Sequence, residues 1–354
     1  MTDMNNTNEM QTDRNDLPDA DAAATAEASK TAPAAAEVGK STVVNALEEI
    51  KAEKAIEKES GKGEVKHIGY WHLIARRFFR QPRAIIGVTV FVILILIALF
   101  GGRFAKFSYE DPDFTALSAA PSADHWLGTD SSGIDMYAAL CHGLGRSLTI
   151  GVLSSVITTV IAAIYGTAIA YFRGIVEKIG MWLLDMLMVI PAFLLIALMV
   201  RAANASAGWL WLVFGMSIFG WIGPARTLRT MALSLRERDY VKASKYMGVN
   251  SFTIIIRHLV PNLASIIILN LILGVISSVG SETALSFLGL GIKVPDTSLG
   301  TLLAGGQTTL QTAPWVIGVP SVALIVLCVC LMMISDALRD AVDPRSGATG
   351  QVSA

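Results

Sequence analysis

Six long apolar runs, separated by polar segments, constrain most strongly what this chain folds into. The runs cover about residues 84–100, 148–171, 181–200, 209–224, 263–279 and 315–334. Most approach the roughly 20 residues that a helix needs to cross about 30 Å of hydrocarbon. Because 53% of the 354 residues are hydrophobic and only 16% are charged, we expect an all-α integral membrane protein with six transmembrane helices. The first run is short, so its flanks must contribute, and Pro191 breaks the third.

A basic segment from Arg226 to Asn262 separates the fourth run from the fifth. Its first half predicts an amphipathic helix whose less polar face holds Tyr240, Val241, Ala243, Ser244 and Met247. The opposite face holds Arg238, Asp239, Lys242 and Lys245. We expect Gly248 to end this helix, because glycine adopts the left-handed conformation without a Cβ clash.

A second amphipathic helix is expected directly after Gly248. Asn250 or Ser251 can accept hydrogen bonds from its free amide groups. Its apolar face is predicted to hold Phe252, Ile255, Ile256, Leu259 and Val260, and Pro261 interrupts the pattern. A segment this basic cannot lie in lipid, so it must project from the side of the membrane that accepts positive charge.

The distribution of Lys and Arg predicts the orientation in the membrane. Near the spans, the segments on the side of the termini hold three times as many Lys and Arg residues as those on the other side. By the positive-inside rule, both termini and the basic segment are cytoplasmic. The predicted location is the cell membrane (the cytoplasmic or inner membrane), crossed several times.

Five segments are predicted along the chain. Residues 1–66 are expected to be a disordered cytoplasmic tail, because they are rich in Ala, Asp, Glu, Asn, Thr and Lys and hold almost no large apolar residues before Val43. The others are an interfacial segment with the first transmembrane helix (67–100), an extracytoplasmic loop (101–146), a membrane core with five transmembrane helices and the loop 226–262 (147–335), and a cytoplasmic tail (336–354). Gly39–Thr42 lacks the earlier glycine and the buried strand of a phosphate-binding loop, so this chain is not expected to bind ATP itself.

No catalytic or metal site is predicted. The five histidines lack metal-ligand spacing, and no predicted span holds a Lys or His at depth to activate a serine nucleophile. Asp185 is interpreted as an interfacial acid that pairs with a nearby Arg or Lys. Glu282, just past the outer end of the fifth run, is interpreted as solvated or locally hydrogen-bonded, although it also suits a translocation path. Asn270 and Pro191 are the other candidates for such a path.

The basic segment resembles the cytoplasmic coupling loop of ATP-binding-cassette importer permeases. The pattern of that loop is Glu-Ala-Ala, three residues, Gly, nine residues and Ile-x-Leu-Pro. Ala243, Gly248 and Pro261 hold the pattern. Four positions depart from it: Lys242 replaces the acid, Ser244 the second alanine, His258 the isoleucine and Val260 the leucine.

Other segments resemble the dipeptide/oligopeptide branch of these permeases. RHLVPN from Arg257 is similar to its RHxxPN form. WLGTDSSGIDMYAALCHGLGRSL is similar to its outer FGTDxxGRDVxSRxxxGxRxSL segment, with Ile134 where Arg is usual. LLDMLMVIPAFLLIAL, SETALSFLGLG and SDALRDAVDPR match further signatures, and WHLIARRFFRQPRAIIG resembles the second (C-type) subunit. The resemblance covers about Trp71 to Arg345.

This resemblance implies the type I importer permease fold, partners and a mechanism. The short helix would dock on a cytoplasmic ATPase subunit through Asp239, Tyr240, Lys242, Ala243, Ser244, Met247 and Gly248. The implied partners are a homologous B-type permease, two cytoplasmic ATPases, an extracytoplasmic peptide-binding protein and membrane lipid, with no nucleic acid. ATP and Mg would bind to the ATPases, so this chain is expected to be a transport subunit without a cofactor, not an enzyme.

The implied function is a path for dipeptides or oligopeptides, and three alternatives stay open. A nickel or nickel-chelate importer is the first, because such permeases share every motif above. The second, from a different class, is an ion or solute channel that works without ATP. For the basic loop alone, the third is binding to anionic lipid headgroups.

Overall fold

The computed structural model describes residues 70–202 and 207–342. The predicted tail 1–66 and the end of the predicted tail 336–354, from residue 343, lie outside the described residues. Within the described ranges the regular structure is helical, apart from a single bridge between Thr129 and Asp135. The predicted all-α class is therefore confirmed for this part of the chain.

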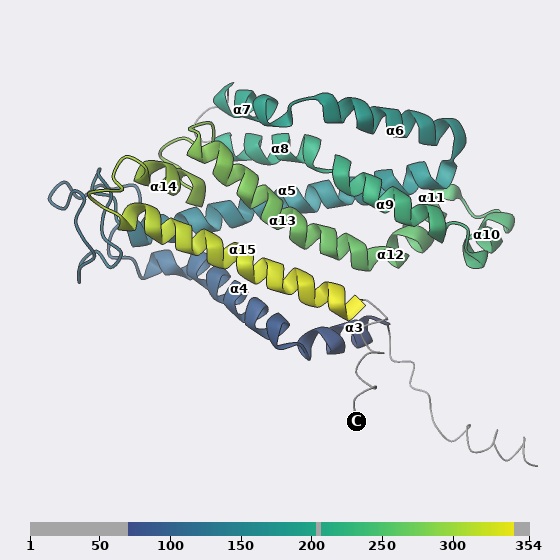
Figure 1. Cartoon of the computed structure of the whole chain (residues 1–354), viewed down its shortest axis with the longest axis horizontal. Helices are drawn as coiled ribbons and strands as arrows, with labels where there is room; N and C mark the ends of the chain where they lie inside the picture. Colours follow the sequence, from purple (N-terminus) through teal and green to yellow (C-terminus); the bar gives the residue numbers. More distant parts are fainter. Residues whose placement is uncertain (1–69, 203–206, 343–354) are drawn as a thin grey trace, which may run out of the picture. The chain divides into compact units, whose positions relative to one another are not determined.

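The helices follow one another with short connections except on the side of α14 (Figure 1). Their bounds are α3 Tyr70–Phe79, α4 Pro82–Phe100, α5 Met136–Phe172, α6 Gly174–Val189, α7 Ala192–Ala202, α8 Gly208–Gly220, α9 Ile222–Leu235, α10 Asp239–Tyr246, α11 Ser251–Ile254, α12 Val260–Asn262, α13 Ala264–Phe287, α14 Leu299–Gly306 and α15 Trp315–Val342. A 3₁₀ turn (η1, Gly101–Arg103) extends α4, and a π turn (η3, Ile255–Leu259) joins α11 to α12.

Five described helices are long and apolar enough to cross a membrane: Pro82–Arg103, Met136–Phe172, Gly208–Leu235, Ala264–Phe287 and Trp315–Val342. The pair α6 and α7 passes the same test together, with a bend of 68° between its halves. Pro191 stands in that break, as predicted, since it has no amide hydrogen to continue the helix. Counting the bent pair as one span gives the six predicted spans.

The bounds of several spans differ from the sequence-based expectation. Helix α5 begins at Met136, so the last part of the predicted loop 101–146 is helical. Asp135 caps α5, because its side chain accepts a hydrogen bond from the amide of Ala138. The first turns of α5 contain His142 and Arg146, whose polarity hid them from a hydropathy criterion. The fourth span likewise continues as α9 through Leu235, well beyond the predicted end near residue 224.

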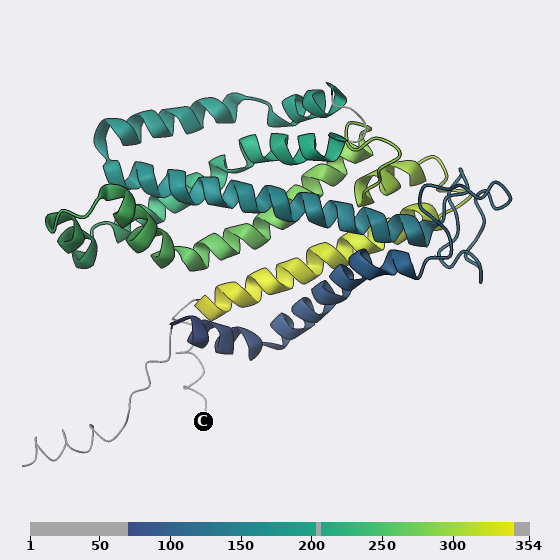
Figure 2. The same cartoon turned by 180° about the vertical axis from the view of Figure 1, so that it is seen from behind.

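Helix α5 lies at the centre of the bundle, packed along α13, α9 and α8, while α15 packs along α4 (Figures 1 and 2). Small residues allow these close contacts. A Cβ added at Gly166 of α5 would lie 2.5 Å from the carbonyl oxygen of Ala225 in α9. Large apolar side chains such as Leu198 and Val322 are instead exposed on the outside of the bundle, which is the pattern of a surface that faces lipid.

The two ends of the bundle carry different structures. The segment that connects η1 to α5 lies at one end together with α14, and α10 and α11 project at the other end (Figure 1). This arrangement separates the basic loop from the long polar loop by the length of the spans. It is what a helix bundle that crosses a bilayer requires of its polar connections.

Candidate functional site

The projecting loop is built as two short helices around Gly248. Helix α10 ends there because Gly248 has φ +77°, the left-handed conformation predicted from the sequence. The amide of Gly248 donates to the carbonyl of Lys245, and the amide of Val249 donates to that of Ser244 at 3.2 Å. Asn250 then caps α11 by accepting a hydrogen bond from the amide of Phe252 at 3.0 Å. Both predicted roles are confirmed.

Helix α10 buries a narrower face than the sequence predicts. Only Val241 and Ser244 of the predicted face are buried. Tyr240 is 41% exposed, Met247 is 73% exposed and Ala243 is also exposed. Val241 belongs to a buried cluster with residues of α11 and the π turn, and Ala168 and Tyr171 near the end of α5 pack against this cluster. An apolar and small-residue strip therefore faces outward from the described chain.

The apolar face predicted for the second half of the loop is confirmed in part. Ile255 and Leu259 are buried and Val260 packs partly buried beside them, whereas Phe252 is 62% exposed and Ile256 is 37% exposed. Ile254, which was not predicted, is buried instead of Phe252. The π turn from Ile255 to Leu259 has more residues per turn than an α-helix, so the side chains within it depart from α-helical spacing. The amide of Val260 donates to the carbonyl of Ile255 in this turn. Pro261 then stands at the start of α12, where its missing amide hydrogen is tolerated.

The charged residues beside α10 centre on Glu237, which the sequence analysis did not single out. Its carboxylate lies 2.9 Å from the guanidinium of Arg236, 3.4 Å from Nζ of Lys242 and 3.6 Å from the guanidinium of Arg173. Hydrogen bonds from Arg236 and Lys242 lower the pKa of Glu237. Lys242, at the position of the acid in the importer pattern, is thus paired with a carboxylate of its own chain. Asp239 lies exposed in the first turn of α10.

Two arginines of the basic segment lie on α9 inside the bundle and not in the loop. Arg226 pairs with Asp185 of α6, so the predicted interfacial pairing of Asp185 is confirmed. Arg229 pairs with Glu177 near the start of the same helix. These two ion pairs join α9 to α6. A hydropathy profile locates helices along the chain but does not predict which helices lie side by side.

Glu282 is fully buried inside α13 and not past its outer end, so the predicted position and the solvated interpretation are wrong. The other interpretation, local hydrogen bonding, is confirmed. Its carboxylate accepts hydrogen bonds from Ser286 at 2.7 Å, Ser298 at 2.6 Å and Ser147 at 3.1 Å. In this structure Glu282 joins α5, α13 and the start of α14 and does not face an open path.

A polar cavity of about 230 Å³ lies between α5, the junction of α8 with α9, and α13. Its lining includes the hydroxyls of Thr158 and Ser277 and the amide of Asn270. The side-chain nitrogen of Asn270 is buried without a hydrogen-bond partner in the described chain. Pro191 does not line this cavity and is exposed at the break between α6 and α7. Of the three predicted path residues, Asn270 is thus the one beside a polar space within the membrane.

A second polar cluster joins α5 to the loop before α14. Asp296 lies 2.9 Å from Nε2 of His142 and 2.9 Å from Nε of Arg146. Burial by itself raises the pKa of Asp296, but the hydrogen bond with His142 and the charge of Arg146 outweigh it, and the net pKa is lowered. The guanidinium of Arg146 also lies 4.8 Å from the ring centre of Trp209. The cluster was not predicted from the sequence, because at least 150 residues separate Asp296 from His142 and Arg146 along the chain.

Among the described residues, no group of three or more His, Cys, Asp or Glu side chains is arranged to hold a metal ion. The described chain also has several candidate membrane spans, a basic loop that projects at one end, and a polar cavity between the spans. This is the architecture of a helical membrane protein that crosses the membrane several times.

Comparison with known proteins identifies the family. Residues 155–347 match the model of the binding-protein-dependent transport system inner membrane component, and residues 69–121 match the N-terminal TM domain of oligopeptide transport permease C. The oligopeptide transport system permease protein OppC of Mycobacterium tuberculosis (strain H37Rv) is 42% identical over 77% of this chain and 94% of the relative. The Escherichia coli K12 protein of the same name is 33% identical over 83% and 98%.

One solved structure, an inward-facing form of the MetNI methionine ABC transporter, matches with a TM-score of 0.44 and 18% identity over 59% of this chain and 98% of that chain. The sequence matches decide the assignment. This chain belongs to the family of binding-protein-dependent transport system inner membrane components. It is a permease subunit, so its part in the system is transport and not an enzymatic reaction, and permeases of this family work with ATPase and permease partners.

Proposed function

We propose that this chain forms half of the translocation path of an ATP-driven oligopeptide importer and couples that path to a cytoplasmic ATPase. The proposal is supported by relatives named oligopeptide permeases that align with more than nine tenths of their own length. The observation that carries it is the outward-facing strip of Tyr240, Ala243 and Met247 on the projecting helix α10. A surface of this kind, in a loop outside the membrane, suits a protein partner.

Helix α10 is suited to transmit motion because it is connected firmly on one side only. Val241 packs against Ile254, Ile255 and Leu259, so a push on the exposed strip is carried into the start of α13. Gly248 fixes the angle between α10 and α11. The ATPase would bias a bundle with two states through this contact, which is how a partner's conformation can control a membrane path.

The proposed complex contains one homologous B-type permease, two ATPases that hold ATP and Mg, and an extracytoplasmic peptide-binding protein. Both termini and α10 would be cytoplasmic, since the Lys and Arg bias of the loops favours that orientation. The polar cavity around Asn270 supports a path between the spans of this chain and its partner permease. Neutral hydroxyl and amide groups suit the backbone of a peptide, whatever its side chains.

The test uses the complete importer in a strain that lacks this gene, with Met247→Asp compared with Met247→Leu. Aspartate places a charge on the exposed strip, whereas leucine keeps the strip apolar. The comparison therefore distinguishes the loss of an apolar docking surface from the effect of replacing Met247 by any other residue. We expect both variants to reach the membrane with the B-type permease. Met247→Asp should lose the co-purifying ATPases and ATP-dependent uptake of a labelled tripeptide, and Met247→Leu should keep both.

Three results would contradict the proposal. Uptake of labelled nickel in place of the tripeptide would show a nickel importer, and flux that does not depend on ATP would show a channel. Unchanged ATPase recovery with Met247→Asp would show that α10 is not the docking helix.

A further inference from the structure

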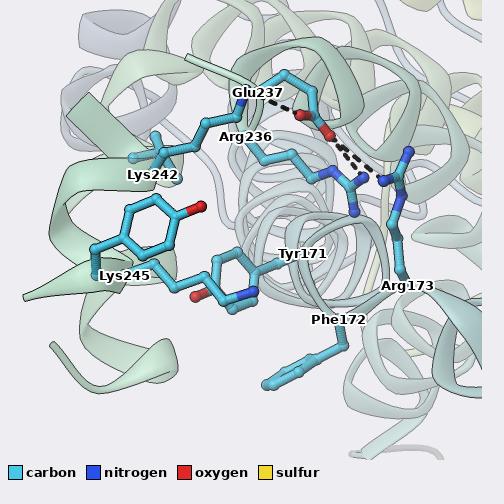
Figure 3. Close-up of a pocket in the computed structure, with 9 residues that line it drawn as sticks. Tyr171, Phe172, Arg173, Arg236, Glu237, Lys242 and Lys245 are labelled. Atoms are coloured by element: carbon cyan, nitrogen blue, oxygen red, sulfur yellow. Dashed lines mark hydrogen bonds and ion pairs between the residues drawn. The ribbon is translucent and has the colours of Figure 1, made fainter. Parts of the chain in front are cut away.

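A basic pocket lies between the end of α5 and the inner flank of α10. Its cavity has a volume of about 350 Å³. Four cations line it, Arg173, Arg236, Lys242 and Lys245, together with the single carboxylate of Glu237 (Figure 3). Tyr171 and Phe172, the last two residues of α5, complete its wall.

The pocket carries positive charge that the described chain does not neutralise. Glu237 is shared by Arg173, Arg236 and Lys242, so one negative charge serves three cations. Lys245 forms no ion pair with any described residue. Positive charges held close together repel one another unless an anion joins them.

Arg236 indicates that the site is built and not a loose group of surface lysines. It is 8% exposed, and its guanidinium donates a 2.7 Å hydrogen bond to the carbonyl of Ala170. Its Nε is buried and has no hydrogen-bond partner in the described part of the chain. A guanidinium fixed in this way is pre-organised for an anion with several oxygens, such as a phosphate group.

The neighbouring surface is apolar and belongs to the part of the bundle that faces lipid. Helix α5 ends a membrane span at Phe172, which is 51% exposed. Ile175 and Ile179 on the first turns of α6 are 74% and 58% exposed. A phosphate in the pocket would therefore have apolar surface beside it along which acyl chains can lie. A free anion such as inorganic phosphate would gain no contact with this apolar surface.

We propose that this pocket binds the phosphate headgroup of an anionic phospholipid, whose acyl chains lie along the start of α6. Basic pockets at the boundary of transmembrane helices bind such headgroups. The site is separate from the proposed docking strip. With 100° of rotation per residue, Lys242 and Lys245 point to the opposite side of α10 from Ala243 and Met247. The lipid would hold α10 against α5 while the other side of the helix stays available to the ATPase.

The experiment is native mass spectrometry of the full-length chain in a non-ionic detergent, titrated with phosphatidylglycerol. Separate titrations with phosphatidylcholine and with inorganic phosphate distinguish an anionic lipid from any lipid and from free phosphate. We expect saturable binding of phosphatidylglycerol, and at least tenfold weaker binding of the other two probes.

The variant Arg173→Gln/Lys245→Gln removes two exposed cations from the pocket. Each removal should weaken binding about fivefold, and the pair about thirtyfold. The control Arg80→Gln/Arg257→Gln makes the same change of charge at two exposed positions outside the pocket and away from α6, and should leave binding unchanged. Glu237→Gln removes the only carboxylate in the lining and should tighten binding, an effect that misfolding cannot produce.

Equal affinity for phosphatidylcholine, preference for inorganic phosphate, or equal weakening by the control pair would each overturn the proposal. Weaker binding by Glu237→Gln would do so as well. Because this readout needs neither ATPase nor peptide, its failure would leave the proposed importer function untouched.

Discussion

Substituting Gly166 by alanine should push α5 and α9 apart. The added Cβ would lie 2.5 Å from the carbonyl oxygen of Ala225 and 3.2 Å from the amide nitrogen of Arg229. Both neighbours are backbone atoms of α9, so no side-chain rotation can relieve the contact. The helices must move apart, and overpacking of this kind costs about 1–3 kcal/mol.

Gly145→Ala on the same helix is the matched control. Its Cβ would lie 3.5 Å from the nearest atom, the carbonyl oxygen of Ala98, which is an ordinary contact distance. Both substitutions gain the same helix propensity, up to about 1 kcal/mol, so the difference between them reports the contact with α9 alone. At about 2–4 °C per kcal/mol, Gly166→Ala should melt roughly 5 °C below Gly145→Ala.

The assay measures the melting temperature of each purified chain in the same detergent. Unfolding is monitored as the loss of the monodisperse peak on size-exclusion chromatography after heating. Transport should fall in parallel for Gly166→Ala, because α9 leads directly into the loop that we propose docks on the ATPase. Equal melting temperatures of the two variants would refute the claim that α5 and α9 meet at backbone contact.

Three further outcomes are expected. Glu282→Ala removes the acceptor of three serine hydroxyls and should lower the free energy of unfolding by about 2–4 kcal/mol, whereas Glu282→Gln should lose less, as thermal melting can show. Asp296 has a lowered pKa, so its contribution to stability is present above the ordinary carboxyl pKa and is lost as pH falls below about 4. The variant Asp296→Asn should therefore have a lower melting temperature at pH 7, and its melting temperature should change less with pH in the acid range. Gly248→Ala forces φ +77° on a residue with a Cβ and should reduce ATP-dependent uptake through a cost of about 1–2 kcal/mol, while Gly223→Ala, in open space on α9, should not.

The spans and the turn chemistry were predictable because they depend on local signals. Hydropathy locates a helix in lipid, and Gly248 and Asn250 act on amides within a few residues of themselves. The ends of the spans were less predictable. Helices α5 and α9 continue past the apolar runs, and the arginines in these continuations, Arg146, Arg226 and Arg229, each pair with a carboxylate of another segment. Hydropathy cannot distinguish a polar residue that ends a span from one that has a partner on the next helix.

The polar network was predictable only where one partner was conspicuous. Asp185 drew notice as an acid within an apolar run, and Arg226 was found beside it. Glu282 was a candidate because it follows the outer end of an apolar run, but its three serine partners come from segments up to 135 residues away, so the sequence did not indicate its burial. The role of Glu237 could not be predicted, because an acid in a basic loop resembles an ordinary surface residue. Only the fold places Arg173 beside it, together with Arg236 and Lys242.

These contacts bear on how a push on α10 can reach the membrane. Helix α9 is joined to α6 by the pairs of Arg226 and Arg229, and it meets α5 at Gly166 without an intervening side chain. Three helices joined in this way should not shift separately, because any sliding would break two ion pairs or a backbone contact. The chain can bend more easily at the π turn and at the break at Pro191. A force on the docking helix should therefore rotate α5, α6 and α9 as one body, with changes of angle confined to the π turn and the break between α6 and α7.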